Sequence, residues 1–297
     1  MKKNVRDLGY QVILYTLFGV FSLMCVYPFY YLVIYSLSSP AEALRHNVVL
    51  WPQGFTFDNY AAILSLKNIG NALLVSCSRV IAGTLGGTFL TAMLAYVLMQ
   101  REMPLRKFFY RLVVVTMYLN AGLIPWYLTM RFLGLKNNAL LYILPYLIGA
   151  FNLILIKTFM EQLPGSLQES AQIDGAGPLT IFVRIILPVC KPVLSAVVVF
   201  TAVFHWNAWT DNFYLVSKPA LQTLQMTLLN YLRESDNIAQ AMQQGNTAQT
   251  LQNARAALTP MSIRITLTVF VTLPIMIVYP FMQRYFIKGM LLGAVKG

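Results

Sequence analysis

The amino-acid sequence predicts an all-α, polytopic membrane protein with six transmembrane helices and both termini on the cytoplasmic side. Three observations predict this fold class. Of the 297 residues, 58% are hydrophobic and only 11% are charged, whereas a soluble domain has about 25% charged residues. Six charge-free runs each approach or exceed the roughly 20 residues that a membrane-spanning helix needs. Basic residues are denser in the segments that this topology places inside.

The first apolar run, residues 12–37, is interpreted as an uncleaved span. It is longer than the core of a signal peptide, and Val26-Tyr27-Pro28 stands where a small-residue cleavage site is needed. A turn-rich outer loop, 38–71, follows it. The remaining predicted spans are 80–99, 112–130, 137–156, 192–210 and 265–283.

The distribution of basic residues sets the orientation. With the N-terminus inside, the inner segments carry 13 of the 22 basic residues although the outer loops are longer. An excess of Lys and Arg on the cytoplasmic side is the usual pattern in membrane proteins. The net charge of +12 is therefore explained by orientation and by contact with anionic membrane lipid, and no nucleic-acid partner is expected. The inner basic residues are Lys2, Lys3, Arg6, Arg101, Arg106, Lys107, Arg111, Lys157, Arg184, Lys191, Arg284, Lys288 and Lys296.

The long outer segment, 211–264, belongs to the same domain, because residues 1–297 show no repeat and no inverted halves. Within it, 221–232 has apolar residues at near-helical spacing, which predicts a helix along the membrane surface. Residues 234–257 are rich in Gln, Asn and Ala and are expected to be flexible. The three cysteines lie in apolar stretches without metal-ligand spacing, so neither a disulfide framework nor a metal site is predicted.

A polar insert, 161–188, faces the cytoplasm in this topology. Ser166 and Glu169 have the spacing of a capping box at the start of a two-turn helix. Gly175 suits the left-handed residue after that helix, and Pro178 suits the first turn of a second helix. The pattern predicts a helix-turn-helix elbow. Local rules alone also fit an ordinary amphipathic connector in which Glu169 is only a cap.

The elbow sequence ESAQIDGAGPLTIFVRIILP, residues 169–188, resembles the EAA loop of ATP-binding-cassette (ABC) importer permeases of type I fold. It matches every spaced position except the second letter, where Ser170 replaces Ala. Asp174-Gly175-Ala176 and the closing Leu187-Pro188 resemble the sugar-importer branch, and within it the maltose-type permeases that handle oligosaccharides and polysaccharide fragments. Apolar motifs over nearly the whole chain agree, among them GLIP at 122–125 and FNLI at 151–154.

This resemblance implies a role for the elbow. In the family it is the coupling helix, which sits in a cleft of a cytoplasmic ATPase. Glu169 is expected to meet a basic residue of the ATPase, Ala171 to permit close approach and Gly175 to set the turn. The coupling set that the resemblance implies is Glu169, Ser170, Ala171, Asp174, Gly175, Leu187 and Pro188.

The C-terminal tail also resembles that of maltose-type permeases, where it reaches between two ATPases. The implied contact residues are Ala294, Val295, Lys296 and Gly297, and a frayed terminus is the alternative. The outer stretch 234–257 occupies the place where such permeases have a loop that probes the solute-binding protein. A plain flexible loop fits that stretch as well.

Residues for a substrate path are selected by chemistry. Polar groups at membrane depth usually face a partner or a water-filled cavity, and sugars bind to aromatic rings and planar polar side chains. An interfacial aromatic belt with ordinary helix–helix hydrogen bonds is the alternative interpretation. The candidates are Asn120, Trp126, Tyr127, Asn152, Trp206, Asn207, Trp209 and Asp211.

The expected partners follow from what the chain lacks and from the resemblance. No phosphate-cradling motif is present, so no cofactor is expected in this chain, and ATP and Mg²⁺ are expected to be bound by a dimeric cytoplasmic ABC ATPase. A second, paralogous permease and an extracytoplasmic solute-binding protein complete the expected assembly. The alternatives are an importer permease for peptides, polyamines or ions, a secondary transporter and a membrane enzyme. A secondary transporter usually carries coupling carboxylates in its spans, and a membrane enzyme needs a convergent catalytic set. The charge-free spans of this sequence contain neither.

Overall fold

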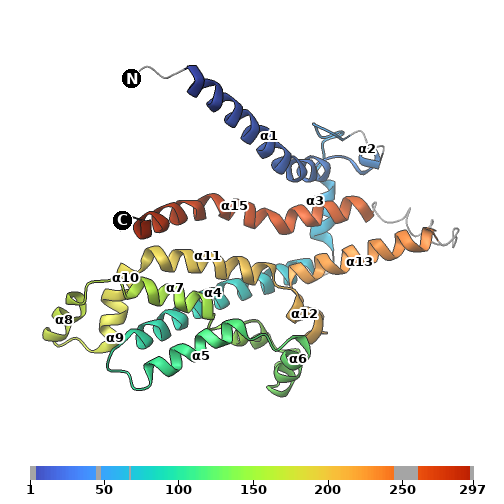
Figure 1. Cartoon of the computed structure of the whole chain (residues 1–297). Helices are drawn as coiled ribbons and strands as arrows, with labels where there is room; N and C mark the ends of the chain where they lie inside the picture. The colour runs from blue at the N-terminus through green and yellow to red at the C-terminus, as the bar shows by residue number, and fades with distance from the viewer. Residues whose placement is uncertain (1–4, 45–47, 67, 244–259, 295–297) are drawn as a thin grey trace. The chain divides into compact units, whose positions relative to one another are not determined.

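The computed structural model describes residues 5–44, 48–66, 68–243 and 260–294. These residues are helical and contain no strand (Figure 1), which confirms the predicted fold class. Their contacts group the chain into two compact units, each assembled from segments distant in sequence. One unit contains residues 1–69 and 228–273, and the other contains 70–227 and 274–297. The prediction of one membrane domain over the whole chain stays a prediction.

In the first unit, α1 (Val5–Ser36) is the predicted first span. Its C-terminal end is tied to α3 (Asp58–Ser65) by a buried amide, because Asn59 donates through Nδ2 to the carbonyl oxygens of Ser36 at 2.9 Å and Ser38 at 2.8 Å. The short helix α2 (Pro40–Leu44) packs against the same end, where Tyr35 and Ala43 are buried together. Most of α1 exposes large apolar side chains, as expected for a helix surrounded by lipid.

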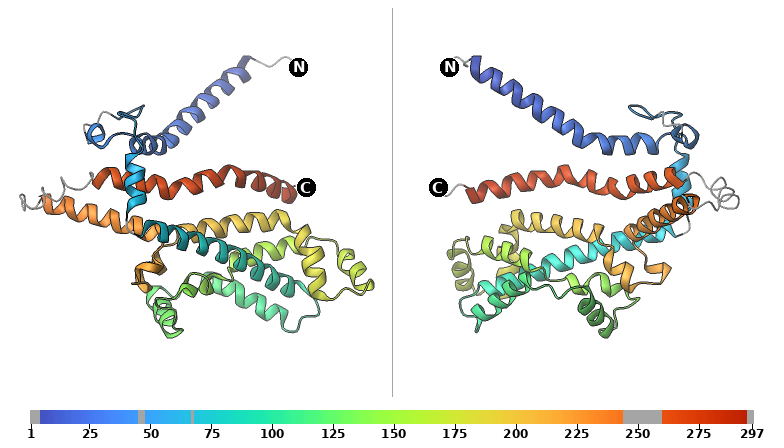
Figure 2. Two further views of the ribbon diagram at one scale, coloured as in Figure 1. Left: turned by 180° about the vertical axis from the view of Figure 1, so that it is seen from behind. Right: turned by 45° about the vertical axis from the view of Figure 1, so that its right-hand side comes forward.

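The second unit is built around α4 (Ile69–Met99), which contains the predicted second span. Figures 1 and 2 agree that α4, α5 (Arg106–Tyr118), α7 (Ala150–Met160) and α11 (Lys191–Asn207) run alongside one another. The short helices α8 (Ser166–Ile173), α9 (Pro178–Ile181) and α10 (Leu187–Val189) lie at one end of this unit. Helices α6 (Leu123–Phe132) and α12 (Thr210–Leu215) lie at the opposite end.

Three described helices are long and apolar enough to cross a membrane, and two bent pairs raise the number to five. The fourth predicted span combines the 3₁₀ turns η1 (Ala139–Tyr142) and η2 (Leu144–Tyr146) with α7, at an angle of 46°. The fifth predicted span, 192–210, lies in α11 and the break that follows it, and α11 reaches the length of a span only together with the second helix of the elbow, which meets it at 83°. The sixth lies in α15 (Pro260–Ala294). The count of six and the orientation of the termini stay predictions.

The predicted third span, 112–130, is not one helix. Residues 119–122 break it into α5 and α6. Asn120 accepts a hydrogen bond from the Gly122 backbone N–H at 2.9 Å, which closes a local turn, and Gly122 has φ of +82°. Asn and Gly are residues that favour such turns. The prediction of one continuous helix was therefore wrong, because the apolar run contains a turn of three polar or small residues, Asn120, Ala121 and Gly122.

The outer segment also departs from expectation. The helix predicted over 221–232 is present as α13 (Leu224–Gln243), but it continues into the stretch expected to be flexible. Gln and Ala are good helix formers, which explains the extension. A 3₁₀ turn, η4 (Pro219–Leu221), precedes it. The rest of the segment expected to be flexible, from residue 244, lies outside the described residues.

Candidate functional site

The first helix of the elbow is α8, and its end is set by glycine. The Gly175 N–H donates to the Gln172 carbonyl at 3.0 Å, and the Ala176 N–H donates to the Ala171 carbonyl at 2.9 Å. These two bonds form a Schellman motif, which needs a left-handed residue after the helix. Gly175 supplies it with φ of +81°. The predicted role of Gly175 in setting the turn is thus present in the backbone geometry.

The start of α8 differs from the prediction. The helix begins at Ser166 itself, and Gly165 is the N-cap, with no side-chain capping bond. The Gly165 carbonyl accepts from the backbone N–H groups of Gln168 and Glu169. The predicted capping box between Ser166 and Glu169 was therefore wrong, because the cap shifted by one residue to the glycine. As a result, the Glu169 carboxylate is not used to cap its own helix.

The second helix of the elbow contains a π-helical turn. Pro178 occupies the first position of α9, as predicted, and η3 (Phe182–Ile186) then has π geometry before α10. Pro188 lacks an N–H and its ring clashes with the carbonyl four residues earlier in a regular α-helix. A wider turn before Pro188 relieves that clash. The turn carries the chain to Cys190 and the 83° bend into α11.

The inner face of the elbow is part of the main core of its unit. Ala171 is 7% exposed, and Ile181, Phe182 and Ile186 are at most 1% exposed. The Phe182 ring lies 5.2 Å from that of Tyr96 on α4. Burying each large apolar side chain stabilises this contact by roughly 1.5–3 kcal/mol. The elbow is therefore fixed to the membrane helices, and the small Ala171 side chain allows α8 to pack closely on its own unit.

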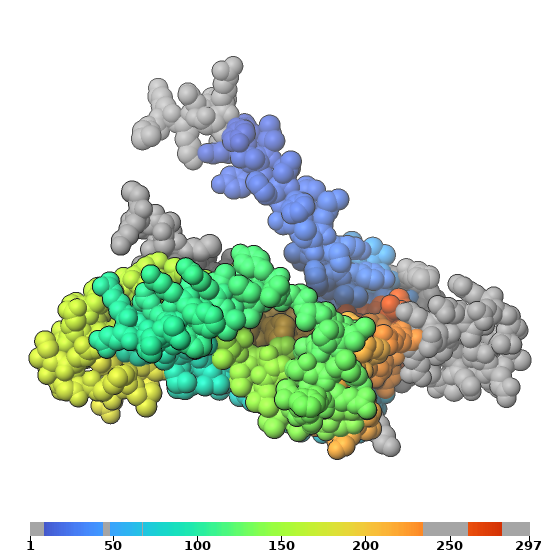
Figure 3. All heavy atoms as spheres, turned by 60° about the horizontal axis from the view of Figure 1, so that its bottom comes forward, coloured from blue at the N-terminus to red at the C-terminus, as the bar shows by residue number. Residues whose placement is uncertain are grey.

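The outer face of the elbow carries exposed carboxylates and exposed apolar side chains. Glu169, Ser170 and Asp174 are exposed. Beside them Ile173 is 87% exposed and Leu179 is 65% exposed. Sequence reasoning missed both apolar residues, although Ile173 stands out as a large apolar residue next to the helix end. In the view of Figure 3 the elbow, in yellow, forms one end of its unit.

The remaining predicted coupling residues lie in two places. Leu187 is partly buried against the core of the elbow, and Pro188 is exposed. Ala294 is the last residue of α15. Val295, Lys296 and Gly297 lie outside the described residues.

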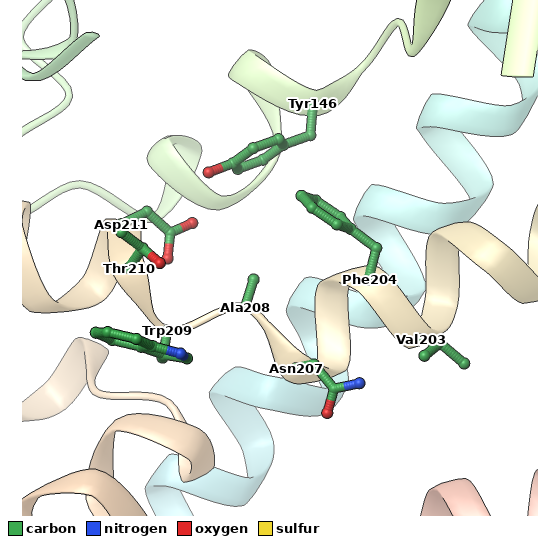
Figure 4. Close-up of a pocket in the computed structure, with 8 residues that line it drawn as sticks. All are labelled: Tyr146, Val203, Phe204, Asn207, Ala208, Trp209, Thr210 and Asp211. Atoms are coloured by element: carbon green, nitrogen blue, oxygen red, sulfur yellow. The ribbon is translucent and has the colours of Figure 1, made fainter. Parts of the chain in front are cut away.

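A second candidate site is a pocket of about 360 Å³ at the break between α11 and α12. Aromatic rings form much of its wall. The rings of Tyr146 and Phe204 meet edge to face at 5.2 Å, and Trp209 lies across from them (Figure 4). Asn207 and Thr210 add polar groups. Aromatic surface with a few placed polar groups is typical of ligand pockets. The lining residues are Tyr146, Val203, Phe204, Asn207, Ala208, Trp209, Thr210 and Asp211.

The pocket brings together only part of the predicted substrate path. Asn207, Trp209 and Asp211 line it, whereas Tyr146, Phe204 and Thr210 were not predicted. Their aromatic or polar side chains were visible in the sequence, but the contact between residue 146 and the 203–211 segment is tertiary.

The other predicted path residues lie elsewhere. Trp126 and Tyr127 pack against the apolar cluster around Met130. Asn152 donates to the Thr201 hydroxyl at 3.3 Å and so joins α7 to α11. Asn120 closes the turn between α5 and α6. Trp206 is half-buried and does not line the pocket.

A buried ion pair lies behind the pocket. Arg79 of α4 donates to both carboxylate oxygens of Asp211, at 3.0 and 2.5 Å, and the two side chains are 1% and 0% exposed. The predicted topology counts Arg79 among the nine basic residues of the outer side, directly before the second span, and it gives no sign of this pairing across 132 residues. Asp211 therefore already has a partner and cannot be a free ligand of a sugar. Asp211 lines the pocket, and its predicted place beside a substrate path stays a prediction.

The fold and the elbow define a class of protein: a helical membrane protein whose second unit has a helical elbow packed on its core at one end and a small pocket toward the other. Comparison with known proteins gives the family. Residues 87–292 match the family described as "Binding-protein-dependent transport system inner membrane component". The chain belongs to this family of ABC importer permeases. It is thus a multi-pass membrane transport subunit and not itself an enzyme.

Individual relatives agree over nearly their whole length. The chain is 34% identical to the polygalacturonan/rhamnogalacturonan transport system permease protein YtcP of Bacillus subtilis, over 97% of this chain and 98% of that protein. It is 25% identical to the arabinooligosaccharides permease AraQ of the same organism, with 97% and 96% coverage. Among solved structures, a bacterial ABC transporter that imports the acidic polysaccharide alginate matches with a TM-score of 0.86, 26% identity and 96% and 99% coverage.

Proposed function

We propose that this chain forms half of the translocation pore of an ABC importer for oligosaccharides or polysaccharide fragments. The observation that carries the proposal is the elbow, with its buried apolar inner face and its exposed outer face of carboxylates and apolar side chains. The carbohydrate names of the relatives favour sugars over peptides or polyamines. The aromatic pocket between α11 and α12 supplies chemistry that suits a sugar ring.

The elbow acts as the joint to a dimeric cytoplasmic ATPase, which binds ATP and Mg²⁺. Glu169 and Asp174 meet basic groups of that partner, and Ile173 and Leu179 enter an apolar part of its cleft. Closure of the ATPase dimer draws two elbows together, and the attached helices move as rigid bodies to open the cavity outward. An extracytoplasmic binding protein delivers the sugar, and a second, paralogous permease completes the pore.

The experiment replaces Glu169 with Lys in the complete transporter, reconstituted with its partners. Glu169 is exposed and makes no capping bond, so Glu169→Lys should insert and assemble in the membrane like the wild type. Reversing the charge at the joint should abolish sugar uptake and sugar-stimulated ATP hydrolysis.

A matched control is Glu102→Lys, since Glu102 is exposed in the turn between α4 and α5 and outside the elbow. The control should transport at the wild-type rate. Normal uptake by Glu169→Lys at normal protein levels would remove Glu169 from the coupling mechanism. Failure of the wild-type transporter to take up any oligosaccharide from its binding protein would overturn the carbohydrate assignment.

A further inference from the structure

The Arg79 guanidinium is bound on several sides to the wall of the pocket. Besides its two bonds to Asp211, its Nη1 donates to the Ala208 carbonyl at 3.1 Å. Ala208 and Asp211 stand on either side of Trp209, at the break where α11 gives way to α12. One side chain of α4 thus fixes both ends of the turn that carries this tryptophan.

Two aromatic rings hold the guanidinium in place. Its central carbon lies 4.8 Å from the ring centre of Tyr142 and 5.9 Å from that of Tyr146, distances at which a cation is attracted to a ring face. The Tyr146 hydroxyl points toward the Asp211 carboxylate (Figure 4). Arg79 is therefore in contact with three lining residues of the pocket: Tyr146, Ala208 and Asp211.

A pair buried this completely needs a reason other than stability. Replacing a buried ion pair with well-packed apolar residues is often neutral or stabilising, because removing two charges from water is costly. An apolar pair, however, would not fix the relative orientation of the two segments that it joins. A planar guanidinium that binds a carboxylate through two parallel bonds fixes both the distance and the angle between its partners.

We propose that Arg79 is a positioning residue for the sugar pocket. It holds the 208–211 turn at a fixed angle to α4, so that the Trp209 ring is presented to the sugar as it passes. Arg79 does not touch the sugar, since its side chain is 1% exposed and both of its terminal nitrogens donate to the Asp211 carboxylate. The inference rests on the proposed function of the pocket.

The test separates positioning from stability by replacing both partners. Arg79→Met combined with Asp211→Leu removes the fixed geometry that the ion pair imposes but leaves no unpaired buried charge. The complete transporter, with its ATPase, second permease and loaded binding protein, is reconstituted in liposomes. The readout is the number of sugar molecules imported per ATP hydrolysed, which does not depend on how much active transporter is present.

The double variant should keep a thermal melting temperature near that of the wild type. Its sugar-to-ATP ratio should fall by roughly tenfold, because displacing a binding group by roughly 1 Å can cost even more. Arg79→Lys keeps the positive charge but loses the planar, two-pronged guanidinium. The sugar-to-ATP ratio of this variant should therefore lie between those of the wild type and the double variant. Asp211 variants alone are avoided, because they leave a buried charge unpaired.

Two control variants show how the sugar-to-ATP ratio responds to changes that do not affect the positioning of the pocket. Arg131→Met removes an exposed arginine of α6 and should leave the ratio unchanged. Leu267→Ala opens a cavity at a fully buried position of the other unit, so uptake and ATP hydrolysis should fall together and the ratio should stay constant.

A wild-type ratio in the folded double variant would overturn the proposal. If that variant does not fold, Arg79→Lys decides: an unchanged ratio overturns the proposal, and a lowered ratio supports it. These outcomes are distinct from failure of the proposed function, in which the wild-type transporter itself would import no oligosaccharide.

Discussion

At the scale of single residues, the contact between α4 and α11 depends on a glycine. The His205 ring is 1% exposed and lies directly over Gly83, in the space that any side chain at this position would occupy. Gly83→Ala should therefore force the ring out of place and destabilise the protein by about 1–3 kcal/mol, as overpacking of a filled core usually does. Thermal unfolding of the purified protein in detergent measures the change.

Gly86 offers a matched control on the same helix. A Cβ added there would meet only Leu147 Cδ2, at 3.7 Å, an ordinary contact distance. Gly86→Ala should leave the melting temperature nearly unchanged. The double variant Gly83→Ala, His205→Ala removes the ring and should recover part of the lost stability. Equal melting temperatures for the two single alanine variants would contradict the proposed fit.

Individual residues also show the limits of sequence reasoning. Gly175 and Pro178 were predictable, because their backbone preferences act within a few residues of chain. Arg79 was not, because its partner lies 132 residues away and no local pattern connects them. A basic residue flanking an apolar run looks the same in sequence whether it faces water or a buried carboxylate.

At the scale of elements, the exposed apolar side chains of the elbow lead to a prediction about how it binds the ATPase. Ile173 is 87% exposed and Leu179 is 65% exposed, and neither contributes to the buried core of the elbow. Changing both to Ser should leave folding intact and weaken association with the ATPase by roughly tenfold or more, since apolar side chains that become buried carry much of the affinity of an interface. Co-purification and titration of the ATPase measure this.

Phe132 provides the control for that experiment. It is 89% exposed, at the end of α6 on the opposite side of the unit from the elbow. Phe132→Ser removes a comparable apolar surface and should leave the affinity for the ATPase unchanged. Loss of the ATPase from both variants alike would mean that the elbow has no special part in the contact.

The helices themselves were largely predictable, and the exceptions have a common cause. Apolar composition located the long helices, because lipid imposes it along their whole length. Composition says nothing about a break inside an apolar run, so the turn at 119–122 was missed. The π turn before Pro188 was also missed, because it compensates for a proline within a continuing helix and leaves no sign in the hydrophobic pattern.

At the scale of the whole molecule, the distribution of basic residues predicts that both termini lie in the cytoplasm. A fluorescent protein fused after Gly297 should fluoresce in cells, because it folds only on that side. Alkaline phosphatase inserted within residues 244–259 should be active, because it needs the outer side. The reverse pair of results would invert the topology and place the elbow outside, where it could not meet an ATPase.

The elbow and the pocket lie at the two ends of a bent pair of helices, which meet near Cys190 at an angle of 83° and can act as a lever. The short arm, 178–189, is about 18 Å long and the long arm, 191–207, is about 25 Å long at 1.5 Å per helical residue. If the bend keeps its angle, a displacement of about 1 Å at the tip of the short arm becomes about 1.4 Å at the tip of the long arm. Asn207 stands at that tip and lines the pocket. Under the proposed function, a small displacement of the elbow by the ATPase would reach the pocket enlarged, and turned through nearly a right angle.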